Sequence, residues 1–238
     1  MANGYLMRQI TVIGVGGIGC ALLPHLARYL QAKGEVARVT LVDGDAFEAR
    51  NADRQAFNRL GNKATVKAME LAQQFQGLSF RALAEFVTPE NVEASVGPGD
   101  VVFLAVDNHA TRRLVSDRCQ RLAEVTLISG GNDYTDGNVQ VYLRRAGRDV
   151  TLPLTRFHPE IADPKDRSPH ELSCEELSRG AVPQLLFANL AVAAAMLNAF
   201  YACEVGKLRY GEVYLDVLEG RANPVARDLP GDPIDPAA

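Results

Sequence analysis

The sequence predicts an α/β protein built on a doubly wound, mostly parallel sheet, and three observations lead to this fold class. Short β-branched runs alternate with stretches of helical apolar spacing from residue 8 to residue 129. The run at 100–106 is apolar at almost every position, as in strands buried on both faces of a parallel sheet. From Gly131 on, an alternating pattern replaces these runs and predicts an added antiparallel portion.

The elements of the parallel portion follow one another in β-α-β order. The first β-branched run ends in glycines, and helical spacing begins directly after them, which is typical of a strand, a tight turn and a helix. The expected strands are 8–13, 36–42, 79–87, 100–106 and 125–129, and the expected helices are 17–32, 62–76, a short one after Pro89, and 109–122.

The last part of the chain is expected to complete the same domain. Residues 145–180 contain few apolar residues and several prolines, so they predict a long crossover loop of the kind that is commonly functional. A helix at 182–203 and a strand at 212–218 follow. The Pro- and Asp-rich residues 223–238 predict a flexible tail, which leaves residues 1–222 as a single domain.

Composition narrows the class of partners. The 29 acidic residues against 25 basic ones give a net charge of −4, which provides no general attraction for nucleic acid or for an anionic membrane. The uncharged stretch at 181–203 is long enough to span a membrane. However, Gln184, Asn189 and Asn198 oppose insertion and alanine contributes little to it, so we expect a buried helix. Neither nucleic acid nor a membrane is an expected partner.

The four cysteines, at positions 20, 119, 174 and 203, are widely spaced and include no C-x-x-C pair. They indicate neither a disulfide framework nor a four-thiolate zinc site, so we expect a protein of the reducing cytoplasm. His158 and His170 lie in the crossover loop and are expected to be solvated.

A glycine-rich turn follows the first strand. Gly14, Gly16, Gly17 and Gly19 form G-V-G-G-I-G at the start of the first helix, where backbone N–H groups and the helix N-terminus can approach phosphates. Asp43 ends the second strand, where its carboxylate can accept hydrogen bonds from a ribose hydroxyl. Together they predict an adenine-nucleotide site, and the alternative is a turn needed only for close helix–strand packing. These residues do not separate ATP from NAD.

Further motifs distinguish an ATP site from an NAD site. Residues 42–55 read V-D-G-D-A-F-E-A-R-N-A-D-R-Q, Lys63 follows, and residues 105–112 read A-V-D-N-H-A-T-R. In this order and spacing they resemble the ThiF, MoeB and HesA family, the bacterial relatives of ubiquitin-activating enzymes, and most closely its compact members such as the PRTRC-system ThiF proteins. The resemblance covers about residues 8–220. It implies a Rossmann-like fold, a homodimer, and a nucleotidyltransferase that uses ATP and Mg²⁺.

The resemblance also implies roles for individual residues. Arg54 and Lys63 would supply positive charge at the phosphates, and Asp107 would hold Mg²⁺, a cation that prefers carboxylate and phosphate oxygens. Asp43 would bind the ribose. The full nucleotide-binding set that the resemblance implies is Gly14, Gly16, Gly17, Gly19, Asp43, Asp45, Asn51, Arg54, Gln55, Lys63, Asn108 and Arg112.

Each of these residues also has an ordinary structural interpretation. Arg54 and Asp45 could form a surface ion pair, and Asn108 could merely cap the helix that follows it. Lys67 lies one helical turn beyond Lys63 and competes with it for the phosphate role. We prefer Lys63 because it opens the predicted helix, as the lysine of the family does.

The segment L-S-C-E-E-L-S-R-G-A-V-P-Q-L at 172–185 resembles the family segment that crosses over the nucleotide. Cys174 falls on the cysteine that some members use to hold an activated protein as a thioester or acyl disulfide. Glu175 and Glu176 would raise the pKa of its thiol, so a catalytic and an idle cysteine both stay open. Structural zinc is expected to be absent because the two C-x-x-C pairs of other members are missing.

The predicted function is adenylylation, with ATP and Mg²⁺, of the C-terminal carboxylate of a ubiquitin-like or sulfur-carrier-like protein, followed by transfer to Cys174 if that cysteine is catalytic. One alternative is a catalytically silent scaffold subunit, because the R-Y-x-R-Q element of many members has no counterpart before Arg8. The other is an NAD-dependent oxidoreductase. Arg54, Lys63 and Asp107 argue against it, since hydride transfer has no use for a metal-bound triphosphate.

Overall fold

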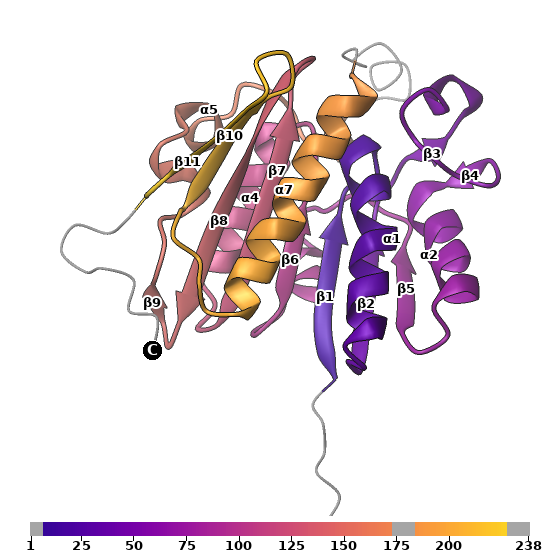
Figure 1. Ribbon diagram of the computed structural model, residues 1–238, viewed down its shortest axis with the longest axis horizontal. Coiled ribbons are helices and arrows are strands. Elements are labelled where there is room, and N and C mark those ends of the chain that lie inside the picture. The colour runs from indigo at the N-terminus through magenta and orange to yellow at the C-terminus, as the bar shows by residue number, and fades with distance from the viewer. Residues whose placement is uncertain (1–6, 173–183, 228–238) are drawn as a thin grey trace, which may run out of the picture.

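The computed structural model describes residues 7–172 and 184–227. A nine-stranded sheet forms the centre of the molecule, in the order β11-β10-β8-β7-β6-β1-β2-β5 with β9 paired to β8 (Figure 1). Its strands are β1 (Arg8–Ile13), β2 (Ala37–Val42), β5 (Ser79–Leu83), β6 (Val101–Leu104), β7 (Val125–Asn132), β8 (Asp136–Arg145), β9 (Arg148–Asp149), β10 (Glu212–Asp216) and β11 (Arg221–Val225). Two short strands, β3 (Ala46–Phe47) and β4 (Gly61–Asn62), pair separately.

Helices cover both faces of this sheet. The α-helices are α1 (Gly17–Ala32), α2 (Lys63–Gln74), α3 (Val92–Ser95), α4 (His109–Gln120), α5 (Pro159–Ala162) and α7 (Leu186–Glu204), and the 3-10 turns are η1 (Ala49–Asn51), η2 (Leu154–Arg156) and η3 (Pro169–Glu171). The β5–β2, β2–β1, β1–β6 and β6–β7 pairs are parallel, whereas β7–β8, β8–β10 and β10–β11 are antiparallel. The predicted α/β fold with an antiparallel addition is therefore confirmed.

Successive side chains of the central strands point to opposite faces of the sheet, so the interior consists of two hydrophobic cores. Ile10 and Val12 of β1 belong to the core beneath α1, α2 and α7, whereas Ile13 belongs to the core beneath α3 and α4. In β6, Phe103 faces the first core and Val102 and Leu104 face the second. Both faces are buried, which explains why this strand lacks the polar alternation of a half-exposed one.

Helix α7 lies on the same face of the sheet as α1 and packs on β7 and β8 (Figure 1). A Cβ at Gly130 would come within 2.3 Å of the Met196 Sδ, and one at Gly137 within 2.7 Å of the Val192 Cγ2. These two glycines therefore allow the helix to approach the sheet closely. Of the helices that the structure describes, α7 alone is long and apolar enough to cross a membrane, and 39% of its apolar window is buried here.

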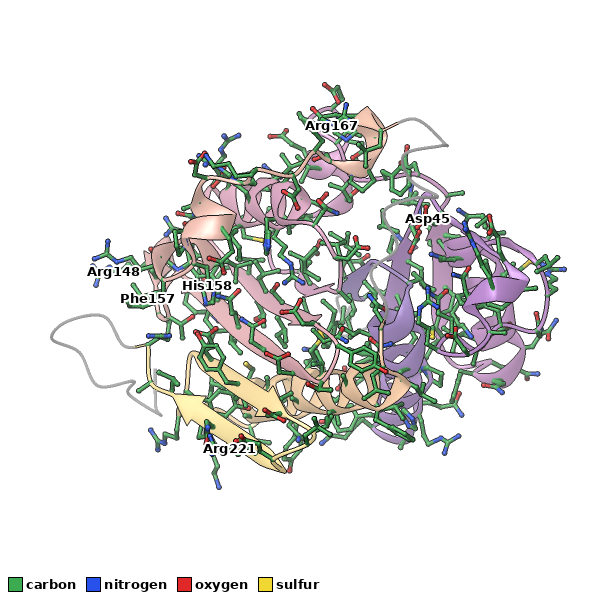
Figure 2. All side chains as sticks on the ribbon, turned by 90° about the horizontal axis from the view of Figure 1, so that it is seen from above. Asp45, Arg148, Phe157, His158, Arg167 and Arg221 are labelled. Carbon is green, nitrogen blue, oxygen red and sulfur yellow. The ribbon has the colours of Figure 1, made fainter. Side chains whose placement is uncertain are left out.

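The crossover loop expected at 145–180 contains short elements as far as the structure describes it, namely β9, η2, α5 and η3. His158 is buried, with Nδ1 2.8 Å from Glu160 and Nε2 2.8 Å from Glu212, so the expectation that it is solvated was wrong. Figure 2 shows it beside Phe157, on the opposite side of the molecule from Asp45. Glu212 lies 54 residues away in sequence, and only folding brings this partner to the histidine.

The C-terminal end differs from the expected boundary. Strand β11 (Arg221–Val225) pairs antiparallel with β10, so residues 223–225 belong to the sheet and not to the expected tail. Pro224 is tolerated there because an edge strand does not need every backbone N–H for pairing. The rest of the expected tail, from residue 228, lies outside the described residues.

Candidate active site

The candidate site lies at the carboxyl ends of the parallel strands. The chain leaves β1 and builds β2 and β5 on one side of it, then returns to place β6 on the other side. Ligands of doubly wound sheets bind at such a reversal of strand order. The glycine-rich turn follows β1, and the loop with Asp107 follows β6, so the two segments flank this point.

The glycine turn fits tightly against the loop after β6. Gly14 has a φ of 89°, and a Cβ there would lie 2.5 Å from the carbonyl oxygen of Ala105. Gly16 is the N-cap of α1, and neither a capping side chain nor an acidic residue is described in the first turn of this helix. The first N–H groups of α1 are therefore left for a ligand, which makes this end of the helix a suitable anion site.

Asp43 holds the backbone of the same turn. Its Oδ2 accepts a hydrogen bond from the Val15 N–H at 2.6 Å, and its Oδ1 accepts one from Asp45 at 2.8 Å. Burial raises the pKa of Asp43 to about 6, although Lys63 acts in the opposite direction. Each carboxylate oxygen can accept a further hydrogen bond, so the predicted ribose contact remains chemically open.

Lys63 begins α2 close to the carboxylates of Asp43 and Asp45 at the end of β2. Its Nζ lies 3.1 Å from the Asp45 Oδ2, and the preceding Asn62 caps the helix by accepting from the Thr65 N–H at 2.9 Å. The Nδ2 of Asn62 also donates to the carbonyls of Asp43 and Asp45. These bonds join the start of α2 to the end of β2, so Lys63 lies at the site.

Lys67 is committed elsewhere. Its ammonium donates to the Glu70 carboxylate at 2.5 Å and to the Ala56 carbonyl, and it lies 4.5 Å from the centre of the Phe57 ring. Lys67 could reach a phosphate only by giving up these three contacts, whereas the described side-chain partner of Lys63 is Asp45 alone, at the end of β2. The geometry therefore supports Lys63 over Lys67.

Arg54 and Gln55 leave buried polar atoms unpaired, and Gln55 lies near the glycine turn. Arg54 pairs with Asp53 at 2.9 Å and not with Asp45, and its Nε is buried without a partner among the described residues. The Oε1 of Gln55 is likewise unpaired, and its Nε2 lies 3.9 Å from the Cβ that Gly16 lacks. Buried polar groups normally have partners, so these atoms favour a ligand at this point. Asn51 takes part in the capping box of η1 through the Glu48 N–H.

The loop after β6 presents Asp107 at the surface, followed by a well-capped helix. Asn108 accepts from the Thr111 N–H at 2.8 Å, so its interpretation as a helix cap is confirmed. Asp166 of the crossover segment accepts from the N–H groups of His109 at 2.6 Å and Ala110 at 3.1 Å. The crossover segment is therefore attached to the helix that begins beside Asp107.

Arg112 makes structural hydrogen bonds in addition to the nucleotide contact that was predicted for it. Its guanidinium donates to the Ser129 hydroxyl at 2.8 Å and to the carbonyls of Val106 at 2.6 Å and Gly130 at 2.9 Å. Burial lowers its pKa to about 10, while the nearby Asp107 opposes the change, so it stays charged at neutral pH. Its donors join β7 to the loop after β6, a purpose that the sequence motif alone did not reveal.

Asn189 of α7 lies beside the glycine turn and was not among the site residues predicted from the sequence. It is fully buried, and a Cβ on Gly17 would lie 2.1 Å from its Nδ2. Helical spacing could have identified this residue. Asn189 shares a helix face with Val192 and Met196, at i+3 and i+7, and the buried face of an Ala-rich helix normally has an apolar residue at such a position.

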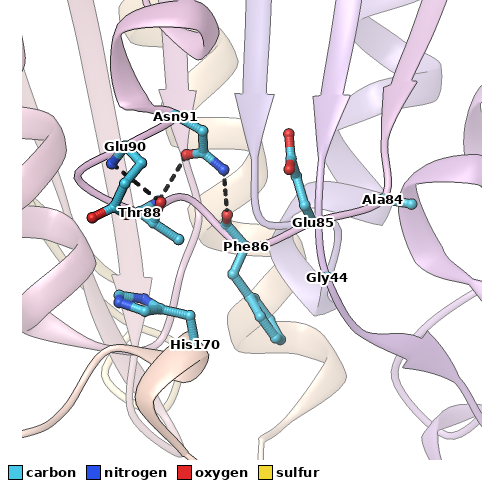
Figure 3. Close-up of a pocket in the computed structure, with 8 residues that line it drawn as sticks. All are labelled: Gly44, Ala84, Glu85, Phe86, Thr88, Glu90, Asn91 and His170. Carbon is cyan, nitrogen blue, oxygen red and sulfur yellow. Dashed lines mark hydrogen bonds between the residues drawn. The ribbon is translucent and has the colours of Figure 1, made fainter.

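A cavity of about 480 Å³ opens beside the end of β2 (Figure 3). Gly44, which directly follows Asp43, forms part of its wall, and a Cβ on this glycine would lie 2.7 Å from the Phe86 ring. Asn91 shapes the opposite loop by donating to the Phe86 carbonyl and accepting from the Thr88 N–H. The lining residues are Gly44, Ala84, Glu85, Phe86, Thr88, Glu90, Asn91 and His170.

The described cysteines are poor nucleophiles. Burial raises the pKa of Cys20, and it raises the pKa values of Cys119 and Cys203 to about 12. Thiolate is the reactive form of cysteine, so none of these three is a candidate for covalent catalysis. Cys174 lies outside the described residues, and its role stays a prediction.

Several characterised proteins are similar to this chain in sequence. "Adenylyltransferase and sulfurtransferase MOCS3" of Anopheles gambiae is 32% identical over 143 residues, which are 58% of this chain and 31% of that protein. The MOCS3 protein of Bos taurus is 36% identical over 137 residues, covering 56% of this chain and 29% of the relative. The chain thus matches about a third of the length of these relatives.

Solved structures share the fold. The crystal structure of E. coli MccB with ATP superimposes with a TM-score of 0.71 at 18% identity, covering 95% of this chain and 66% of that one. The structure of PaaA gives a TM-score of 0.69 at 17% identity, covering 93% of this chain and 64% of that one. Residues 6–208, which contain every site residue described above, match the ThiF family, and the chain therefore belongs to this family.

Proposed function

We propose that this protein uses ATP to adenylylate a carboxylate at the C-terminus of a ubiquitin-like or sulfur-carrier-like protein. The observation that carries the proposal is the uncapped N-terminus of α1 at the reversal of strand order, with Lys63 close to the Asp43 carboxylate that holds the same turn. Anionic phosphates suit this combination of free N–H groups and positive charge. Relatives that are named adenylyltransferases support the same reaction.

The nucleoside has a place next to this anion site. Asp43 would accept from the ribose hydroxyls, and the adjoining cavity would receive the adenine, because Gly44 belongs to its wall. A volume of about 480 Å³ lies within the usual range for small-molecule pockets. Phosphates, sugar and base would then follow the edge of the sheet from the β1 turn to the end of β5.

The residues of this chain can assist the bond exchange at the α-phosphate. A carboxylate oxygen of the acceptor attacks the α-phosphorus, an acyl–phosphate bond forms, and the bond to the pyrophosphate breaks. Lys63 and Arg54 would stabilise the negative charge that grows on the phosphate oxygens and the departing pyrophosphate. The α1 N–H groups would do so without reorganising, since the folded chain already directs them to this point.

Asp107 fits a magnesium ion that accompanies ATP. In the described residues no three His, Cys, Asp or Glu side chains gather into a metal site. Mg²⁺ commonly takes only one or two protein carboxylates and fills its other positions with phosphate oxygens and water. The exposed Asp107, at the end of β6, would hold such an ion, which when bound neutralises phosphate charge.

A second step at Cys174 completes the proposal. The thiolate would attack the acyl carbon of the adenylate, forming a thioester and releasing AMP as the leaving group. The described cysteines are excluded by their raised pKa values, which leaves Cys174 as the candidate. We also propose a cytoplasmic location, where cysteines such as the three described free thiols stay reduced.

The first test is nucleotide choice. Isothermal titration should show ATP binding in the presence of Mg²⁺ and no comparable binding of NAD, because Lys63 and the proposed Mg²⁺ suit the higher negative charge of a triphosphate better than that of the NAD diphosphate. Lys63→Ala should weaken ATP binding. Lys33→Ala, at the far end of α1, is the matched control and should leave it unchanged. Tight NAD binding without a response to ATP would contradict the proposed function.

We also propose that the protein is a homodimer. Helix α7 presents an exposed row at helical spacing that consists of Phe187, Leu190, Ala194, Asn198 and Tyr201, in which Asn198 is the one amide among mainly apolar side chains. Contiguous exposed apolar surface commonly marks an interface. Light scattering should give twice the chain mass of 25.8 kDa, and Phe187→Lys should reduce it to that of one chain. Leu218→Lys, at another exposed position, is the control, and a monomeric wild type at tens of micromolar would refute the dimer.

A further inference from the structure

Asn189 occupies a position where an apolar side chain is expected. It lies on the buried side of α7 with Val192 and Met196, both of which pack against glycines of the sheet. Its relative exposure is 0%. Neither its Nδ2 nor its Oδ1 has a hydrogen-bond partner among the residues that the structure describes.

Such an amide is unfavourable in a ligand-free protein. Its burial removes water from a donor and an acceptor, and residues 7–172 and 184–227 supply no replacement. A leucine of similar size would fill the same space without this penalty. Buried polar groups that stay unpaired commonly reflect a function. The groups that surround this amide therefore indicate its role.

The neighbour of this amide is the phosphate-binding turn. The Nδ2 of Asn189 lies 2.1 Å from the point where a Cβ on Gly17 would stand, so the amide lies directly over the first residue of α1. On the described residues, no side chain caps this helix. Free N–H groups and an unpaired amide donor therefore occur at the same place, and Gln55 adds a third unpaired group near Gly16.

We propose that Asn189 donates through Nδ2 to a phosphate oxygen of the nucleotide bound at the N-terminus of α1, so that α7 contributes a specificity-determining residue to the site. The inference rests on the proposed function. A neutral donor suits the position, because a lysine or arginine at full burial would carry an uncompensated charge whenever the site is empty. The amide gains its partner only when the anion arrives.

The test compares ligand affinity with the stability of the ligand-free protein. Asn189→Leu should weaken binding of ATP–Mg²⁺ and of pyrophosphate about 10-fold or more, as expected for loss of a hydrogen bond to a charged group. The melting temperature of the ligand-free variant should equal or exceed that of the wild type, because the unpaired amide is gone. Asn198→Leu, the same change at an exposed position of α7, should alter neither affinity.

Asn189→Asp keeps the size of the side chain and gives a second measurement if the leucine does not fit. It should also weaken both ligands, because its carboxylate would repel phosphate. Wild-type affinity in Asn189→Leu, or a lowered melting temperature with unchanged affinity, would show a purely structural asparagine and overturn the inference. If the wild type binds pyrophosphate but not ATP, the proposed function fails, while the pyrophosphate series still decides the role of Asn189. Binding of neither ligand refutes both.

Discussion

Asp107→Ala is expected to lower ATP–pyrophosphate exchange about 100-fold or more, measured with an acceptor protein that supports exchange by the wild type. The carboxylate is exposed in the loop after β6. The glycine turn packs against this same loop at Gly14. It is the residue proposed to hold the magnesium ion, so its loss leaves phosphate charge uncompensated in the transition state. Because the side chain is exposed, the melting temperature of the variant should stay close to that of the wild type.

Two variants make this result specific. Asp117→Ala removes a half-exposed carboxylate from the same helix region and should leave exchange nearly unchanged. Cys174→Ala should also retain exchange, because the cysteine acts only after the adenylate has formed, and it should lose a thiol-labile conjugate on the enzyme. Loss of exchange in a folded Cys174→Ala variant would place the cysteine in the adenylation step and contradict the two-step scheme.

Arg112→Met is expected to lower the free energy of unfolding by about 3 kcal/mol or more. The substitution leaves the Ser129 hydroxyl and the carbonyls of Val106 and Gly130 without their donors in a buried region. Urea denaturation followed by circular dichroism measures the change. Arg121→Met, an exposed arginine at the end of the same helix, should change stability by less than about 0.5 kcal/mol.

The same experiment separates the two roles considered for Arg112. If this arginine mainly bound nucleotide, Arg112→Met would keep wild-type stability and lose ATP affinity. The structure leads to the opposite expectation, in which stability falls first and any loss of affinity follows from displacement of the loop that carries Asp107. A stable Arg112→Met variant would therefore return the residue to the nucleotide set.

The order of strands and helices could be predicted from the sequence because the spacing of apolar residues reflects which side chains are buried. Strand β1 at 8–13 and helix α1 at 17–32 have the predicted bounds, since the glycines between them mark the turn sharply. The crossover segment and the last strand were harder to predict. Their stability comes from partners distant in sequence, such as Glu212 for His158 and β10 for β11.

In the candidate site, too, some features could be predicted from the sequence and others required the structure. Motif order alone placed Asp43, Lys63 and Asp107 at the ends of successive elements, and the fold brings these ends to one edge of the sheet. Motif order did not show which polar atoms remain unpaired. Asn189 looked like one of several polar residues in an Ala-rich helix until the structure placed it over Gly17.

The sequence by itself determined the fold class and the glycine turn, and it predicted the set of charged residues at the candidate site, because strand period, helix period and motif spacing are local properties of the chain. Only the tertiary structure decided that Arg112 joins β7 to the loop after β6, that Lys67 is paired with Glu70, and that Asn189 lies over Gly17 at the start of α1. Each of these assignments depends on which donor meets which acceptor once distant segments pack together, and burial makes every unmet pair costly.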